Sequence, residues 1–263
     1  MIKKFNIFLF VFAAGLAGCV STMPAVPKDL PEVPLTAADV HPGKGFPVRE
    51  RLVFRVKWLG MTAGEITAEI NGGVVWQGRP CYLIEVRART SGLASSFYRV
   101  DDLFRSYLDA AAFYPLRHEE LRHEGGYRKD AVTDFDHASG KAHFHNAVDK
   151  SDKIFDIPSG VQDILTSAYL GRFLPLAGGR MFHVKVCNSE KVYDLYISAR
   201  GRSVIAGRRT FHLVPFAKIN GDDIREGRGS GYVTDDAARL PLWVVIKGPV
   251  FTQVTAVLDS PGL

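Results

Sequence analysis

The feature that most constrains the fold of this chain is a regular alternation of polar and apolar residues. Residues 51–58 place an apolar side chain at every second position, the period of a β-strand that is covered on one face only. Similar segments recur about every eight to twelve residues, a spacing typical of all-β sandwiches and barrels. We expect strands at residues 51–58, 66–70, 74–76, 81–89, 103–109, 117–121, 129–135, 141–147, 181–186, 192–197, 209–216, 229–233, 242–246 and 251–258.

Glycine-containing turns separate many of these segments. Asn71-Gly72-Gly73 is predicted to be a hairpin turn, and Gly125-Gly126 and Ser139-Gly140 have the same character. Strands joined by short turns pair in antiparallel fashion. The sequence therefore predicts an all-β, mainly antiparallel fold, built as a strongly curved sheet or as an open barrel or sandwich.

One segment has helical instead of β periodicity. Ser159 and Gln162 have the spacing of a capping box, Asp163 suits the positive end of the helix dipole, and Pro175 would stop the helix. The apolar residues of this segment form a broad stripe, made of Val161, Ile164, Leu165, Ala168, Tyr169 and Phe173. We expect a helix over about residues 160–174 that closes the curved sheet.

The N-terminus has the features of a targeting segment. Lys3 and Lys4 precede an apolar run, residues 5–16, which is too short to cross a bilayer stably and suits the core of a signal peptide. Leu16-Ala17-Gly18-Cys19 resembles the lipobox of bacterial lipoproteins. The resemblance implies cleavage before Cys19 and acylation of its thiol and its new amine, which together give stable membrane anchoring. An ordinary secretory signal with an incidental cysteine is the alternative.

The residues that follow Cys19 predict where the protein is located and where its folded domain begins. Position 20 is Val and not Asp, so the usual inner-membrane retention signal of such lipoproteins is absent, and we expect an outer-membrane anchor facing the periplasm. Residues 19–49 are rich in proline, which predicts an extended tether. Residues 50–263 are then a single β-rich domain.

Charge gives little information about partners. Without residues 1–18, 31 basic and 28 acidic side chains remain. The basic residues alternate with acids and do not cluster, so we expect no nucleic-acid partner. No cofactor is indicated, and the sequence names no protein partner.

Cys81 and Cys187 remain once Cys19 is assigned to the anchor. Both lie in strand-like segments of a protein expected in an oxidising compartment, where a disulfide can persist. One buried disulfide and two separate buried thiols are both compatible with the sequence. Two cysteines alone do not make a metal site.

Two histidine patterns suggest zinc. His118 and His123 are five residues apart, which puts them on different faces of either a helix or a strand, so they do not form the H-E-x-x-H motif of a zinc protease. His143 and His145 share a strand face, with His137 nearby. We favour a solvated histidine face opposite Phe144 and predict no metal site.

Other catalytic motifs are missing. The chain has no G-x-S-x-G elbow, and residues 225–231 are glycine-rich without a following helix to cradle phosphate, so we expect a bulged hairpin there. The pairs Asp101-Asp102, Asp222-Asp223 and Asp235-Asp236 consist of neighbours, which point apart on a strand and favour turns over a carboxylate dyad.

Three stretches together are distinctive: residues 96–102 (Ser-Phe-Tyr-Arg-Val-Asp-Asp), 161–163 (Val-Gln-Asp) and 234–241 (Thr-Asp-Asp-Ala-Ala-Arg-Leu-Pro). In this order the chain resembles, over roughly residues 50–258, the bacterial envelope family called domain of unknown function 3108. The resemblance implies a periplasmic or lipid-anchored all-β domain with one helix, and it carries over no catalytic residue. The chain departs from relatives at Ser203, where they tend to carry an acid after Gly-Arg.

The polar residues of these stretches are the candidate site. Tyr98, Arg99 and Asp102 are candidates to line the mouth of a cavity beside Gln162 and Arg172. A purely structural role is the alternative for each of them. For Asp163 the start of a helix predicts a capping role, in which its carboxylate accepts backbone N–H bonds.

Three functions from different classes fit these features. The first is a binding or accessory lipoprotein whose curved sheet holds an envelope lipid or glycan between apolar walls. The second is a scaffold for envelope assembly, which predicts a large exposed apolar patch or an unpaired edge strand. The third is a lipid or glycan hydrolase that uses Asp163, Tyr98 or the His143/His145 pair, and it requires these side chains to cluster.

Overall fold

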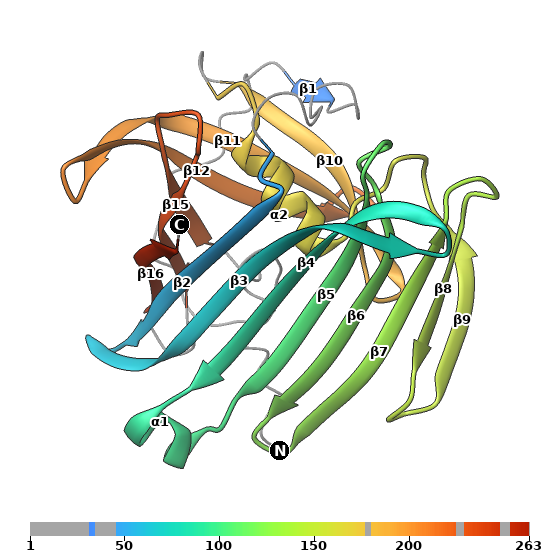
Figure 1. Ribbon diagram of the computed structural model, residues 1–263, viewed down its shortest axis with the longest axis horizontal. Coiled ribbons are helices and arrows are strands. Elements are labelled where there is room, and N and C mark those ends of the chain that lie inside the picture. The colour runs from blue at the N-terminus through green and yellow to red at the C-terminus, as the bar shows by residue number, and fades with distance from the viewer. Residues whose placement is uncertain (1–31, 35–45, 177–179, 225–228, 248–252, 263) are drawn as a thin grey trace.

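The computed structural model describes residues 32–34, 46–176, 180–224, 229–247 and 253–262 (Figure 1). The predicted signal sequence, Cys19 and most of the predicted tether lie outside these residues, and those parts of the sequence analysis stay predictions. Of the described helices, neither has the length and hydropathy needed to cross a bilayer.

Most of the described chain is β-structure, as the alternation predicted. The strands are β1 (Glu32–Pro34), β2 (Arg49–Trp58), β3 (Met61–Trp76), β4 (Arg79–Thr90), β5 (Asp101–Asp109), β6 (Pro115–Glu124), β7 (Tyr127–Asp136), β8 (Lys141–Asn146), β9 (Ser151–Asp156), β10 (Met181–Asn188), β11 (Lys191–Ile205), β12 (Arg208–Ile219), β13 (Asp222–Asp223), β14 (Gly229–Thr234), β15 (Pro241–Lys247) and β16 (Gln253–Gly262). The helices are α1 (Gly92–Phe97) and α2 (Ile164–Arg172).

The described strands pair into one sheet in the order β1-β10-β11-β12-β14-β15-β16-β2-β3-β4-β5-β6-β7-β8-β9, with β13 beside β12. The pairs are antiparallel except that of β1 with β10. Pairing of β16 with β2 joins the last described strand to one of the first, at the centre of the sheet. The sheet is strongly curved: β2 to β9 form a broad face, β10 to β12 cross behind it, and α2 lies between them (Figure 1). The all-β, curved-sheet prediction is confirmed.

Side chains connect the two ends of this open sheet. The Lys129 ammonium on β7 donates to the hydroxyl of Ser189, in the β10–β11 turn, at 2.7 Å, and Lys153 on β9 pairs with Glu190 of the same turn. A small apolar cluster that includes Phe135 and Cys187 packs beneath these contacts. The sheet therefore curls far enough for its β7–β9 end to reach the β10–β11 turn.

The helix α2 is the centre of the interior of the curved sheet. On one side it packs against the β2–β5 face through a cluster made of Phe46, Ile70, Ile84, Phe104, Leu108, Phe113, Ile164, Leu165, Tyr169 and Leu170. A second cluster, which includes Phe182, Ile197 and Leu213, fills the β10–β14 side. Gly171 of α2 faces β11, where a Cβ would come into van der Waals contact with Ile197 Cδ1 at 3.4 Å.

The prediction of a hairpin turn at Asn71-Gly72-Gly73 was wrong. β3 continues through these residues, and its register against β4 shifts between Asn71 and Val74, which is a bulge. Gly72 is needed there because its N–H donates to Val48 O at 2.7 Å, and a Cβ would lie 2.8 Å from Val48 Cγ1. The chain turns later, at Gln77-Gly78, where both residues have positive φ as a tight hairpin requires.

The boundary of the domain also differs from the expected Glu50. Phe46, assigned to the tether, is buried and makes edge contacts with Tyr82 and Phe113. Residues 32–34 of the same segment form β1 on the edge of β10. The proline content predicts an extended chain, and an extended chain can also pair with an open sheet edge. The strand β9 and the short helix α1 were not predicted.

Candidate functional site

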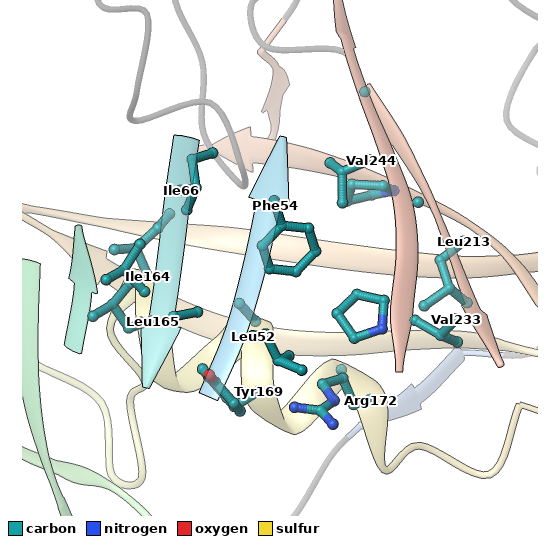
Figure 2. A pocket seen from close by; sticks show the side chains of 18 of the residues that line it. Leu52, Phe54, Ile66, Ile164, Leu165, Tyr169, Arg172, Leu213, Val233 and Val244 are labelled. Carbon is teal, nitrogen blue, oxygen red and sulfur yellow. The ribbon is translucent and has the colours of Figure 1, made fainter. Parts of the chain in front are cut away.

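A cavity of about 160 Å³ lies between α2 and the inside of the sheet (Figure 2). Its walls are almost entirely apolar. One wall comes from β2 to β5, the opposite wall from β11, β12, β14 and β15, and α2 forms the base. The residues labelled in Figure 2 are Leu52, Phe54, Ile66, Ile164, Leu165, Tyr169, Arg172, Leu213, Val233 and Val244.

Strand alternation creates these walls. Leu52 and Phe54 are two residues apart on β2 and so point to the same face, and Ile66 on β3 is the register partner of Phe54. Across the cavity, Leu213 on β12 pairs with Gly231 on β14, which has no side chain to fill the space. The cavity thus lies where two halves of the curved sheet face each other across small residues.

The helix at the base of the cavity begins with a reciprocal cap. Asp163 Oδ1 accepts hydrogen bonds from the N–H groups of Leu165 and Thr166, both at 2.8 Å, and Thr166 Oγ1 accepts from Asp163 N at 2.9 Å. The capping role predicted for Asp163 agrees with this geometry. The box predicted at Ser159 and Gln162 was wrong, because α2 begins four residues later than the start proposed there.

Because the structure puts the cap at Asp163 and the sequence pattern predicted a capping box at Ser159, substitutions at these two positions test which residue caps α2. Asp163→Ala is expected to lower the free energy of unfolding by about 1–2 kcal/mol, because two buried N–H groups lose their acceptor. Ser159→Ala, at an exposed position before the helix, should change it by less than about 0.5 kcal/mol. Urea unfolding followed by circular dichroism measures both. Equal losses would mean that the helix begins at Ser159.

Arg172 fixes the other end of α2 at the rim of the cavity. Its guanidinium donates to both oxygens of Glu50, at 2.5 and 2.8 Å, and to the backbone carbonyls of Ala238 and Arg239 at 2.9 and 3.1 Å. A cation in the last turn also suits the helix dipole. The charge of Arg172 is therefore balanced by Glu50, and the residue connects α2, β2 and the 234–240 segment.

Tyr169 is the polar group of the cavity base that remains unsatisfied. It is buried, and its hydroxyl has no hydrogen-bond partner among the described residues. Burial raises the pKa of Tyr169, so the hydroxyl stays a neutral donor. A buried hydroxyl without a partner is unfavourable by itself, and an acceptor oxygen on a guest would satisfy it.

The six candidate residues do not converge on one site. Gln162 and Asp163 lie at the start of α2, where the Gln162 side-chain amide donates to Phe113 O at 3.1 Å and its backbone bridges to β10. Arg172 lies at the other end of α2. Asp102 and Tyr98 lie beside β6, and Arg99 is exposed. Of the six, Arg172 is on the cavity wall.

Asp102 belongs to a buried ionic cluster, which we define as Asp102, Glu120, Arg122, Glu124 and Lys129. Arg122 Nε donates to Glu124 Oε1 at 2.7 Å, Arg122 Nη1 to Glu120 Oε1 at 3.3 Å, and Lys129 pairs with Glu120. All five side chains are nearly inaccessible to solvent. The cluster therefore lines the inside of the sheet at β5–β7, next to the apolar half.

Burial sets the protonation states in this ionic cluster. Burial, with the charge of Glu124 and a hydrogen bond to it, raises the pKa of Asp102 to about 8. Burial also opposes ionisation of Glu120, but the charges of Lys129 and Arg122 outweigh it and hold the pKa of Glu120 below its usual range. Near neutral pH Asp102 is therefore mostly the neutral acid, whereas Glu120 is ionised beside it.

His118 forms a separate buried contact that resembles part of a catalytic triad. Its Nδ1 lies 2.9 Å from Ser106 Oγ and 3.7 Å from Asp163 Oδ2. A triad needs the hydroxyl and the carboxylate on different ring nitrogens. Here both are at Nδ1, and Nε2 has no hydrogen-bond partner within the described ranges. The arrangement does not provide nucleophilic catalysis.

The other histidines lie where their spacing predicted. His123 is exposed while His118 is buried, so the two are on opposite faces of β6. His143 and His145 are exposed, with Phe144 buried between them, and both bond to Asp152, at 2.8 and 3.0 Å. In the part of the chain that is described, no set of three or more His, Cys, Asp or Glu could hold a metal ion.

Cys81 and Cys187 are both buried and unbonded. The disulfide alternative is not realised: Cys81 is on β4, where it donates to Arg79 O, and Cys187 is on β10, where burial and the nearby Asp163 raise its pKa to about 12. Two neutral buried thiols are small apolar side chains in this fold.

Sequence reasoning missed the residues of the cavity itself. Tyr169, Leu213 and Val233 were assigned to the helix stripe or to strands, and nothing in the sequence indicates that they face a common space. The one available signal is the glycine-rich β14, because small residues opposite large ones allow a gap.

The family described as protein of unknown function (DUF3108) matches residues 53–258. The chain belongs to the DUF3108 family. This confirms the resemblance seen in the sequence. No curated protein matches this DUF3108 chain. A similar solved structure is that of a beta-barrel-like protein of domain of unknown function DUF1849 from Brucella abortus, with a TM-score of 0.56 and 10% identity, covering 81% of this chain and 97% of that one. At this identity the likeness shows the fold alone.

Proposed function

We propose that this DUF3108 protein is a lipid-anchored envelope protein of the periplasmic face of the outer membrane, and that its cavity binds the apolar part of an amphipathic guest. The observation that carries the proposal is the apolar cavity beside α2, with the unsatisfied Tyr169 hydroxyl at its base. Ligand sites commonly combine apolar walls with a few polar groups in this way.

The size of the cavity supports a binding role. An empty apolar void lowers stability by about 24 cal/mol per Å³, so a void of 160 Å³ would cost about 4 kcal/mol. This is a large share of the stability of a typical domain, about 5–15 kcal/mol. A guest that fills the space would offset this loss.

The walls also limit the kind of guest. Cavities of about 150 Å³ hold a single small apolar molecule such as benzene, whereas pockets for whole drug-sized ligands measure about 300–1,000 Å³. The space therefore suits one segment of an acyl chain or one apolar ring. Sugar hydroxyls would find few partners there, so an envelope lipid fits better than an envelope glycan.

The test is to fill the cavity. Ala168 lies on α2 at the cavity wall, and Ala168→Leu is expected to weaken binding of an apolar fluorescent probe by at least about tenfold, because the added methyl groups occupy the guest's space. Titration of the probe against purified protein measures the change. Mass spectrometry of detergent-free protein should also show a lipid that the variant does not retain.

A matched control adds the same bulk elsewhere. Ala138→Leu, in an exposed turn after β7, should leave binding unchanged. Equal binding by Ala168→Leu and the wild-type chain, or wild-type protein free of any bound guest and unable to bind the probe, would contradict the proposal.

A further inference from the structure

One end of the sheet displays apolar side chains that the fold does not use. Consecutive antiparallel strands put the connections β2–β3, β4–β5, β6–β7 and β8–β9 at the same end (Figure 1). The first two of these carry large apolar side chains with high solvent exposure: Phe97 at 83%, Leu93 at 75%, and Leu59 and Met61 at 60% each. We call these four residues the apolar rim.

The helix α1 presents half of the apolar rim. Leu93 and Phe97 are four residues apart and so lie on the same face of the helix. None of the residues of α1 is buried, which is unusual for a helix with two large apolar side chains. Exposed apolar side chains do not stabilise a monomer in water. Their presence on α1 therefore indicates that another molecule covers this surface when the protein functions.

Hydrogen bonds hold this connection in a defined shape. Thr90 N donates to Val100 O at 3.1 Å at its base, and Ser91 N donates to Ala63 O, two residues from Met61 in β3, at 3.0 Å. Tyr98 N donates to Ala94 O at 2.9 Å, which closes the helix. The apolar rim is therefore an ordered projection that joins α1 to the start of β3.

Basic side chains surround the apolar rim. Lys57, Arg99 and Arg128 are exposed and have no ion-pair partner among the described residues. Gly125 N donates to Arg99 O at 2.7 Å, and Arg128 Nη1 donates to Gly125 O at 2.7 Å, so the backbone of Arg99 and the guanidinium of Arg128 both contact Gly125 in the β6–β7 turn. No exposed acid lies in the β2–β3, β4–β5 or β6–β7 connection; the β8–β9 turn adds Lys150 beside Asp149.

We infer that this end of the domain docks on a lipid bilayer with anionic headgroups. Leu93 and Phe97 enter the boundary between headgroups and acyl chains, and Arg99 and Arg128 contact phosphates. Apolar side chains on a short projection beside a basic ring suit a lipid surface, which accepts projecting groups and carries negative charge. A protein partner would have to offer both a matching pocket and acids around it.

The docking surface is separate from the predicted lipid anchor. β2 begins at Arg49, whereas the apolar rim follows the last residue of β2, Trp58. A ten-residue strand spans about 33 Å, so the start of β2 lies at the end of the sheet opposite the rim. Contact of the rim with a bilayer is thus a property of the folded domain and does not depend on the proposed cavity function.

Vesicle co-sedimentation tests the inference. The chain from residue 20 contains every residue that the structure describes and lacks both the apolar N-terminal run and Cys19. We expect it to bind vesicles of equal parts phosphatidylglycerol and phosphatidylcholine, to bind pure phosphatidylcholine less, and to lose affinity as salt rises. Leu93→Ser with Phe97→Ser should weaken binding by at least about tenfold, since two apolar insertions are removed.

The controls use exposed valines elsewhere. Val75 and Val204 are 64% and 67% exposed, and Val75→Ser with Val204→Ser should bind like the wild-type chain. Arg99→Glu with Arg128→Glu should abolish the preference for phosphatidylglycerol. Since all six positions are exposed, the variants should fold normally, which circular dichroism checks. A wild-type chain that stays in the supernatant with both vesicle types, or equal losses in the rim and control variants, would overturn the inference and leave the rim to a protein partner.

Discussion

Arg122→Ala is expected to lower the free energy of unfolding by about 3–5 kcal/mol, the usual loss when one partner of a buried ion pair is removed. Arg122 is 1% exposed, and it is the largest of the fully buried side chains of the described chain. Its guanidinium contacts the carboxylates of Glu120 and Glu124. Without it, the buried Glu124 side chain would lose the guanidinium that donates to its Oε1 at 2.7 Å, and its desolvation would no longer be compensated.

Chemical unfolding at neutral pH measures this loss, and Arg128→Ala is the control. Arg128 is six positions along the chain, carries the same charge, and is exposed. Its replacement should change stability by less than about 0.5 kcal/mol. A loss below about 1 kcal/mol for Arg122→Ala would mean that water reaches the ionic cluster and screens its charges.

The same strand shows what the sequence could predict and what it could not. Alternation located β6 and put His118 and His123 on opposite faces, because the two-residue period depends only on local backbone geometry. The alternation did not predict which face of β6 is buried. The buried face holds His118, Glu120, Arg122 and Glu124, and the outer face holds Leu121, the reverse of the usual pattern.

The reason is that partners from other strands decide burial here. Lys129 on β7 pairs with Glu120, and Asp102 at the start of β5 lies 3.8 Å from Arg122, so the polar face of β6 is covered by residues of other strands. Asp102 and Tyr98 were proposed at a cavity mouth. The structure places Asp102 in the ionic cluster and Tyr98 against Gly125 beside it, so their contacts within the fold favour a structural role.

The cavity is similarly a product of long-range pairing. Its two walls come from strands that are far apart in the sequence, β2–β5 and β11–β15, and they face each other because β16 pairs with β2 and because α2 fills only part of the interior. The helix itself was predictable from its periodicity. Its cap was placed four residues too early, since Ser159 and Asp163 are both good capping residues and only the backbone bridge from Gln162 to β10 selects between them.

The ionic cluster also predicts a dependence of stability on pH. An aspartate in the unfolded chain titrates near pH 4, whereas burial and Glu124 raise the pKa of Asp102 in the folded protein to about 8. Between these values the folded protein keeps a proton that the unfolded chain has released. The free energy of unfolding should therefore fall as the pH rises through this window, by up to about 1.4 kcal/mol per pH unit from this group.

Asp102→Asn should remove that slope. The amide is neutral at every pH, its oxygen can still accept from His123 N, which lies 2.8 Å from Asp102 Oδ1, and its NH₂ can donate to Glu124 as the protonated acid does. The variant should thus gain stability relative to the wild-type chain as the pH increases from about 5 to about 8. Urea unfolding at intervals across this range measures the difference between the two curves.

The neighbouring carboxylate supplies the control. Although burial opposes it, hydrogen bonds from Arg89 and Arg87 lower the pKa of Asp101, so Asp101 is ionised in both states above about pH 5. Asp101→Asn should consequently change the free energy of unfolding by the same amount at every pH between about 5 and 8, without changing its slope against pH. Parallel curves for Asp102→Asn and the wild-type chain would show instead that Asp102 is ionised in the folded protein, with Arg122 as the cation that balances it.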